Sequence, residues 1–287
     1  MKISGFTFLR NAEILCYPYL ESIKSILPLV DEMVVNIGDS IDNTLQQVES
    51  IGSDKIRIIQ SRWNTEMAQN GFVYAQQKMI AQYNCTGDWA FYLEGDEVLH
   101  EEDIPRIKKI MTDRLDDRRV EALAFNYKHF YGLPSQLAVS PAWYRREVRV
   151  IRNTIRSYAP DGLYWLVMNK HRKGRYPTAV MADASIYHYG HVRNIESMSK
   201  KLEMVSQFWG KKGISFSGYG DIDPQALAPF KGTHPQVMES WLRTSAESNF
   251  TLNTQHLLTP RERKHRLAMR VERLLGIDLS KKHFKLI

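Results

Sequence analysis

The fold is decided by the stretch Trp89-Ala90-Phe91-Tyr92-Leu93-Glu94-Gly95-Asp96-Glu97. Its first five residues are apolar or aromatic, which is typical of a buried strand, and three carboxylates follow within four positions. The glycine between Glu94 and Asp96 favours a tight turn that presents both carboxylates together. Open α/β sheets bind ligands outside the carboxyl ends of their strands, so the sequence predicts a charged site at this edge.

Residues before this stretch alternate between strand and helix patterns, which indicates a sheet with parallel strands and crossover helices. Short apolar runs predict strands, and apolar residues at helical spacing predict helices. The expected strands are Ile3–Leu9, Glu32–Ile37 and Lys55–Gln60; helices are expected after Pro18 and over Leu45–Ile51, about Glu66–Tyr83, and Glu101–Leu115.

The pattern changes after residue 115. Strands are expected at Val120–Tyr131, Glu147–Arg152 and Val180–His188, followed by a helix at Glu196–Trp209 and a Gly/Pro-rich loop over Ser215–Pro235. Thr259, Pro260 and Glu262 form a capping box that predicts the start of a C-terminal helix. We therefore expect an α/β fold with a mixed sheet flanked by helices and a helical C-terminal extension.

The acidic turn needs a counter-charge. Carboxylates as close as Glu94 and Asp96 repel each other unless a cation neutralises them. Hard divalent ions prefer oxygen ligands, so Mg²⁺ or Mn²⁺ held here would bridge to the phosphates of a substrate. The alternative is a solvated acidic turn at a strand end that binds nothing.

Polar residues also follow the first two expected strands. Arg10-Asn11-Ala12-Glu13 closes the first strand, and Asp39-Ser40-Ile41-Asp42-Asn43-Thr44 follows the second. An aspartate at such a strand end can hydrogen-bond a ribose or a base, whereas Asp42 and Asn43 are as well explained as a helix cap alone. Three strands thus bring polar residues to one side of the sheet.

In this order the motifs resemble those of family 2 and related GT-A glycosyltransferases, over about residues 1–115. The resemblance implies a GT-A domain over residues 1–210, which binds the nucleotide-sugar and catalyses transfer, and a loop and basic helical extension over 211–287. It implies donor contacts from the first two strand ends (Arg10, Asn11, Glu13, Asp39, Asp42), with Asp39 and Asp42 holding a uridine- or guanosine-type nucleotide. It also implies that Asp96 contacts metal and diphosphate. Glu94 replaces the first aspartate of the usual motif, which still allows sugar and ribose contacts.

A second cluster, Tyr187-His188-Tyr189-Gly190-His191-Val192-Arg193, ends a predicted strand. A downstream histidine often completes the metal shell in GT-A enzymes, and His188 is the candidate here. The alternative is a histidine packed among tyrosine rings with both nitrogens satisfied. Arg193 is expected to neutralise the leaving diphosphate, because that role needs only a positioned cation.

Inversion at the anomeric centre would require a carboxylate that deprotonates the acceptor hydroxyl. Glu147 and Asp161 are the candidates. Glu147 is flanked by arginines, which favours a salt bridge, whereas Asp161 precedes the aromatic Tyr164 and Trp165, where a sugar ring could stack. The sequence therefore favours Asp161.

The positive charge lies in the tail. Nine Lys/Arg and three Asp/Glu fall in residues 259–287, which accounts for +6 of the net charge of +7 and argues against a nucleic-acid-binding body. The helix predicted here is amphipathic and basic, with an apolar stripe at Leu267, Val271, Leu274 and Leu275. Such a helix either lies on an anionic membrane, which would suit a lipid-linked acceptor, or docks on the domain with its basic face solvated.

Cys16 and Cys85 are too few for a disulfide scaffold, and residues 1–10 are too interrupted for a secretory signal. With no run of 18 apolar residues, we expect a cytoplasmic protein, peripheral at the inner face of the membrane.

The predicted function is metal-dependent transfer of a sugar from a UDP- or GDP-sugar to a saccharide or lipid-linked saccharide. A nucleotidyltransferase acting on sugar phosphates is the first alternative, but Arg10-Asn11-Ala12-Glu13 stands where such enzymes usually place a glycine-rich basic loop. A non-catalytic adaptor that binds membranes through its tail is the second, and it would leave the acidic sheet edge without a role.

Overall fold

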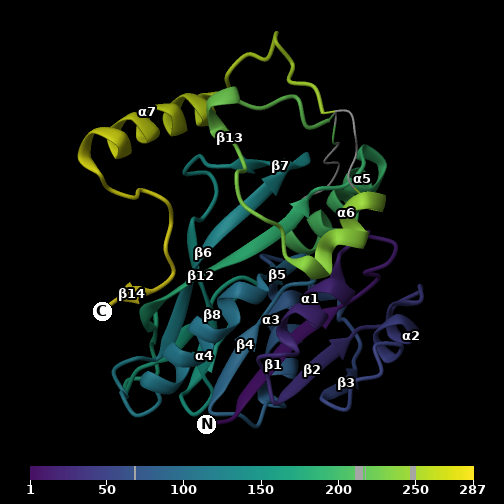
Figure 1. Cartoon of the computed structure of the whole chain (residues 1–287), viewed down its shortest axis with the longest axis vertical. Helices are drawn as coiled ribbons and strands as arrows, with labels where there is room; N and C mark the ends of the chain where they lie inside the picture. The colour runs from purple at the N-terminus through teal and green to yellow at the C-terminus, as the bar shows by residue number, and fades with distance from the viewer. Residues whose placement is uncertain (68, 211–215, 217, 246–249) are drawn as a thin grey trace.

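The computed structural model describes residues 1–67, 69–210, 216, 218–245 and 250–287, and it has the expected α/β architecture with helices flanking a mixed sheet (Figure 1). The main sheet has the strand order β13-β7-β6-β8-β4-β1-β2-β3, and β12, β5 and β14 join it off this path. Its strands are β1 (Ile3–Leu9), β2 (Glu32–Ile37), β3 (Ile56–Gln60), β4 (Trp89–Tyr92), β5 (Glu97–Leu99), β6 (Ala122–Tyr131), β7 (Leu133–Ala138), β8 (Arg146–Arg152), β12 (Thr178–His191), β13 (Leu227–Pro229) and β14 (Lys285–Leu286). A small second sheet contains β9 (Ser157–Tyr158), β10 (Leu166–Met168) and β11 (Gly174–Arg175).

Most predicted helices are present. The α-helices are α1 (Tyr19–Ile26), α2 (Thr44–Glu49), α3 (Phe72–Tyr83), α4 (Ile104–Asp113), α5 (Ile195–Ser206), α6 (Glu239–Ser245) and α7 (Pro260–Leu275). Short 3-10 turns are η1 (Thr65–Met67), η2 (Glu101–Asp103), η3 (Gln207–Trp209), η4 (Pro224–Ala226) and η5 (Gln236–Met238). The predicted capping box at the start of α7 is confirmed by reciprocal bonds between Thr259 and Glu262.

Parallel pairing aligns the strand ends that carry the predicted site. β1 lies between β2 and β4 and is parallel to both, with Phe6 opposite Val34 and Tyr92. Strands buried on both faces read as continuous apolar runs, which is why β1 and β2 have the bounds predicted from sequence. The segments after β1, β2 and β4 therefore emerge at one edge of the sheet.

The single helix predicted over about Glu66–Tyr83 is wrong. The chain forms η1 and then α3, with Asn70 and Gly71 between them in the left-handed region at φ 50° and 70°. A Cβ on Gly71 would lie 2.8 Å from the ring of Trp209, and the Gly71 N–H donates to the Phe208 carbonyl at 2.8 Å. Packing against η3 thus overrides the helical pattern here.

The C-terminal extension returns to the main sheet. β13 pairs with β7, and β14, which follows α7, pairs in parallel with β12 (Figure 1). The boundary predicted at residues 210 and 211 stays a prediction, and residues 211–215 and 217 of the predicted loop region lie outside the described residues. Among the described helices, none is at once long and apolar enough to cross a membrane.

The two cysteines differ in accessibility, which gives a labelling test of the fold. Burial, with the nearby charge of Glu32, raises the pKa of Cys85 to about 12, whereas Cys16 is only half-buried. Because the thiolate is the reactive form, Cys85 at pH 8 should react with iodoacetamide at least ~100-fold more slowly than a free thiol. Mass spectrometry should find a label on Cys16 alone in the folded protein and on both residues after unfolding. Rapid double labelling of folded protein at pH 8 would contradict this packing.

Candidate active site

A cavity of about 480 Å³ opens at the sheet edge where β1 and β4 end. The acidic turn contributes Glu94, Gly95 and Asp96, and the end of β1 contributes Arg10, Asn11 and Ala12. β12 adds His188, and α5 adds Lys201. The convergence predicted from the strand ends is therefore present for the first strand and the acidic turn.

The loops after β1 and β2 mainly bind each other. The Asn11 side chain accepts a hydrogen bond from the Ile41 N–H at 2.9 Å, and Glu13 accepts one from the Asn43 N–H at 3.0 Å. Asp42 accepts from the Ile14 N–H at 3.0 Å and also from Thr44. Glu13 and Asp42 thus lie at the junction of these two loops and not on the cavity wall. Asn11 lies at the same junction and also lines the cavity.

Arg10 and Asp39 form an ion pair at this junction, with Arg10 Nε 3.1 Å from the Asp39 carboxylate. The Asp39 side chain is 46% exposed, so one side of the pair is open to a ligand. Arg10 lines the cavity and Asp39 lies just beyond its wall.

The cavity also has an aromatic wall. Phe8, Trp63, Tyr74, Phe208 and Trp209 line it, and the rings of Trp63 and Tyr74 each lie about 5.5 Å from that of Phe208. Flat apolar faces of this kind suit stacking with a planar ring. The aromatic wall near Trp63 is therefore suited to a base, and the charged Arg10 lies over it, with its Cζ 5.3 Å from the centre of the Trp63 ring.

Asp96 is surrounded by cations that the protein itself provides. Its Oδ2 accepts from Lys201 Nζ at 2.9 Å, and Arg193 Nη2 lies 3.9 Å away. Burial by itself would raise the pKa of Asp96, but the charges around it, led by Lys201, outweigh burial and hold this pKa well below its usual range. Asp96 is therefore an anion at neutral pH.

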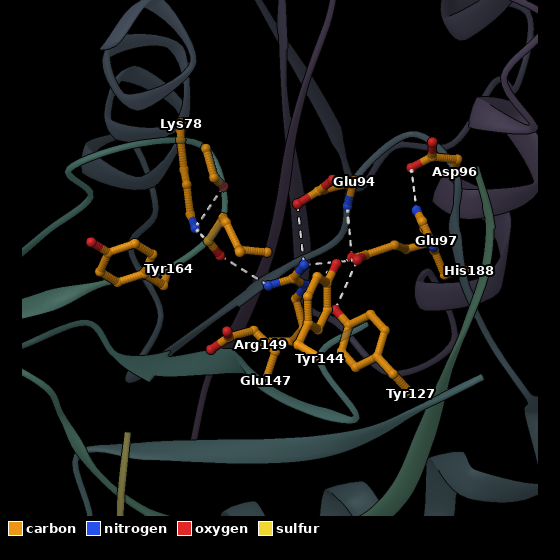
Figure 2. Close-up of polar contacts among 12 residues, drawn as sticks. Lys78, Glu94, Asp96, Glu97, Tyr127, Tyr144, Glu147, Arg149, Tyr164 and His188 are labelled. Atoms are coloured by element: carbon orange, nitrogen blue, oxygen red, sulfur yellow. Dashed lines mark hydrogen bonds and ion pairs between the residues drawn. The ribbon is translucent and has the colours of Figure 1, made fainter. Parts of the chain in front are cut away.

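The other two carboxylates converge on Arg149 instead (Figure 2). Arg149 is fully buried and donates to both oxygens of the buried Glu97, at 2.8 and 2.7 Å, and to Glu94 at 3.1 Å. Burial and the charge of Glu97 raise the pKa of Glu94 to about 8 despite the opposing effect of Arg149. The turn therefore carries less negative charge at neutral pH than three ionised carboxylates would, which weakens the electrostatic reason for a metal.

The hydrogen bond between His129 and His188 determines which ring nitrogen of His188 carries its proton. His129 Nε2 lies 2.7 Å from the Tyr144 carbonyl, which can only accept, so His129 Nε2 carries the proton. His129 Nδ1 then accepts from His188 Nδ1 at 2.9 Å. Burial lowers the pKa of His188, so the ring is neutral with its Nε2 lone pair 3.6 Å from Asp96 Oδ1.

This geometry suits two ligands of one divalent ion. Ligands about 2.1 Å from a shared ion lie roughly 3–3.6 Å apart, and a metal-bound histidine usually donates its other N–H to a fixed acceptor. Within the described chain no group of three or more His, Cys, Asp or Glu side chains could hold a metal. Other ligands would have to come from a substrate or water.

Lys201 was missed in the sequence analysis. It projects from α5 into the cavity, and its Nζ also donates to the Gly190 carbonyl at 3.0 Å. Arg193, which was predicted to neutralise the leaving diphosphate, is only 1% exposed and does not line the cavity. It donates to the Leu15 carbonyl instead. Two lysines in succession at 200 and 201 gave no signal of which one faces inward.

The two candidate bases are separated by the structure. Glu147 is fully buried, bonds His283 Nδ1 at 2.5 Å and does not line the cavity. Asp161 is half-buried beside Gly162 and Leu163, which do line it, and accepts from the Leu163 N–H at 2.8 Å. The predicted stacking surface is absent among the described side chains here, since Trp165 is buried and Tyr164 stacks on His283.

Lys78 and Arg149 hold the rim of the cavity that Gly162 and Leu163 form. Lys78 Nζ donates to the carbonyls of Gly162 and Leu163 at 3.1 and 3.2 Å, and Arg149 donates to the latter at 3.0 Å (Figure 2). The segment next to Asp161 is thus held by the buried side chains of Lys78 and Arg149.

Comparisons with known proteins find similarity to glycosyltransferases. No family model matches the chain. It is similar to uncharacterized glycosyltransferases of Rickettsia typhi and Rickettsia felis, at 28% and 29% identity over 117 residues, which are 41% of this chain. The chain spans about a third of the length of these relatives, 35% and 36% respectively. The glycosyltransferase resemblance indicated by the motifs is thereby confirmed.

Among solved structures, the chain is similar to S. aureus TarS, with 18% identity, a TM-score of 0.42 and coverage of 72% of this chain and 39% of that one. It is also similar to glucosyl-3-phosphoglycerate synthase from Mycobacterium tuberculosis, solved with Mn²⁺, UDP and glucosyl-3-phosphoglycerate. That match has 20% identity, a TM-score of 0.33 and coverage of 44% of each chain.

Proposed function

We propose that this chain transfers a sugar from a nucleoside-diphosphate-sugar to a saccharide or lipid-linked saccharide. The carrying observation is the cavity itself, whose lining combines an aromatic wall with Asp96, Lys201 and His188. A nucleotide-sugar offers partners for both, namely a flat base for the aromatic wall and a diphosphate, next to the bond that breaks, for the charged groups. Arg10 and Asp39 stand where they would contact the nucleoside, which we propose is a uridine- or guanosine-type one.

Metal dependence is part of this proposal. Asp96 and His188 would hold Mn²⁺ or Mg²⁺, which when bound supplies positive charge to the diphosphate. Lys201 binds the other Asp96 oxygen and contributes a fixed charge on the same side. Together they would stabilise the negative charge that develops on the leaving nucleoside diphosphate.

On the acceptor side we propose Asp161 as the base, because it adjoins the cavity rim at Gly162 while Glu147 is enclosed with His283. A lipid-linked acceptor would lie at a membrane surface. The proposal therefore includes a cytoplasmic location and peripheral contact with the inner face of the membrane through residues 259–287.

Calorimetric titration with UDP-, GDP- and dTDP-sugars, with Mn²⁺ and with EDTA, tests the donor site. One nucleotide should bind with micromolar affinity and more tightly with Mn²⁺, and Asp96→Ala should abolish the metal effect while the melting temperature is monitored as a folding control. Asp161→Asn should keep donor binding and lose transfer. Absence of any nucleotide binding, or the same metal response in Asp96→Ala, would sink the proposal. Release of pyrophosphate from a nucleoside triphosphate and a sugar phosphate would favour a nucleotidyltransferase.

A further inference from the structure

Helix α7 faces the body of the protein with its charged side. Arg266 makes two hydrogen bonds to the buried Asp223, at 3.0 and 2.6 Å. The buried Glu272 accepts from Arg145 at 2.7 and 2.9 Å, and Glu262 is occupied by the cap and by His256. Ion pairs and hydrogen bonds on its inner side therefore hold this helix.

The apolar residues of α7 face outward. Leu267, Leu274 and Leu275 are 61%, 83% and 65% exposed, and the stripe continues past the helix in exposed Ile277 and Leu279 (Figure 1 shows α7 at the edge of the molecule). An ordinary surface helix buries its apolar stripe against the core. The ion pairs of α7 agree with the docked arrangement considered from the sequence, in which the basic face is solvated, but the leucines lie on the outward side as well.

The same outward face is basic. Arg263, Lys264 and Arg270 are exposed and, at helical spacing, flank Leu267 and Leu274. The acidic residues of α7 are Glu262 and Glu272, and both are engaged on the inner side. The outward face of this helix thus combines large apolar side chains with positive charge that no ion pair among the described residues neutralises.

This combination selects among partners. A second copy joined through the same face would bring its arginines against those of the first, which is unfavourable. A nucleic acid would satisfy the arginines but leave the leucines in water. An anionic lipid surface satisfies both, because leucines enter the acyl boundary while Lys and Arg remain among the headgroups.

We infer that the outward face of α7 (Arg263, Lys264, Leu267, Arg270, Leu274, Leu275) is a docking surface for a membrane containing anionic lipid. The inference deepens the proposed function, on which its relevance to a lipid-linked acceptor rests, by naming the face and the lipid class. The ties through Asp223, Arg145 and β14 give the helix a fixed position on the body, so docking would also orient the cavity relative to the bilayer.

Vesicle flotation of the full chain provides the test, with phosphatidylcholine vesicles and with vesicles containing about one part in three phosphatidylglycerol. The wild type should bind the anionic vesicles, and high salt should weaken the binding. Leu267→Gln with Leu274→Gln should reduce binding at least ~10-fold, because the free energy of moving two leucine side chains from water into the lipid is lost. Arg263→Gln with Arg270→Gln should reduce it roughly 30-fold on anionic vesicles alone.

Matched controls are available elsewhere on the surface. Ile41→Gln changes an equally exposed apolar residue, and Lys170→Gln with Lys173→Gln removes two exposed charges, so both should bind like the wild type. Unchanged melting temperatures would show that the α7 variants fold. Absence of vesicle binding, equal binding to both vesicle types, or a leucine-dependent dimer without lipid binding would each overturn the inference. Calorimetry with nucleotide on the same samples separates the outcomes, since lipid binding without nucleotide binding would sink only the proposed function.

Discussion

Replacing Lys201 by methionine should weaken UDP binding about 10- to 100-fold while leaving the affinity for uridine unchanged. Lys201 Nζ lies 2.9 Å from Asp96 inside the cavity, where a diphosphate oxygen can take the same ammonium group. A hydrogen bond to a charged group contributes about 1.5–3 kcal/mol, which corresponds to this range. Calorimetric titration with UDP and with uridine measures both values.

The neighbouring lysine is the matched control. Lys200 lies on the same helix but points to solvent, where it pairs with Glu196 at 2.7 Å, so Lys200→Met should bind UDP within about twofold of the wild type. Lys201→Arg keeps the charge and should recover part of the affinity. If Lys201→Met binds UDP as tightly as Lys200→Met does, the ammonium has no part in donor binding.

Replacing Arg149 by methionine should lower the free energy of unfolding by about 3–5 kcal/mol. Arg149 and Glu97 are both fully buried and form an ion pair with two hydrogen bonds. Removing the guanidinium therefore leaves the buried Glu97 carboxylate without a counter-charge. For a chain of this size the melting temperature should fall by roughly 5–10 °C. The Leu163 carbonyl also loses its Arg149 bond, so the cavity rim should loosen and UDP binding should weaken.

An exposed arginine provides the comparison. Arg119 is 83% exposed and pairs with Asp117, so Arg119→Met should cost less than about 1 kcal/mol. Glu97→Gln added to Arg149→Met should restore part of the lost stability, because the buried charge is then gone. Differential scanning calorimetry compares the variants. Equal melting temperatures for Arg149→Met and Arg119→Met would contradict the buried network.

Local pattern predicted most of the fold because the strands of a buried sheet are apolar throughout. β1 and β2 begin and end at the predicted residues, and the cap at Thr259 starts α7 as expected. The helix predicted over about 66–83 failed at Gly71, whose conformation is fixed by Trp209, a contact with no trace in local periodicity. Short strands such as β5 and β14 also depend on partners far along the chain.

The acidic turn was located from sequence, but its electrostatics were not. The sequence predicted a divalent ion at the clustered carboxylates, with a solvated turn as the alternative. The protein's own cations could not be foreseen, because Arg149 and Lys201 stand 52 and 105 positions from their partners Glu97 and Asp96. The period of two in β8 places Glu147 and Arg149 on one face, but only Arg149 pairs with the acidic turn, because Glu147 pairs with His283. For Asp42 the sequence left a capping turn open as an alternative. The bond that Glu13 accepts from the Asn43 N–H needed the loop geometry to be seen.

A crystal structure of the chain with UDP and Mn²⁺ tests the central claim most directly, namely that the charged end of this cavity receives a nucleoside diphosphate. A diphosphate should lie within hydrogen-bond distance of Lys201 Nζ, a base against the aromatic wall near Trp63, and metal density between Asp96 and His188. A nucleotide bound elsewhere on the molecule, with the Lys201–Asp96 pair unchanged, would contradict it.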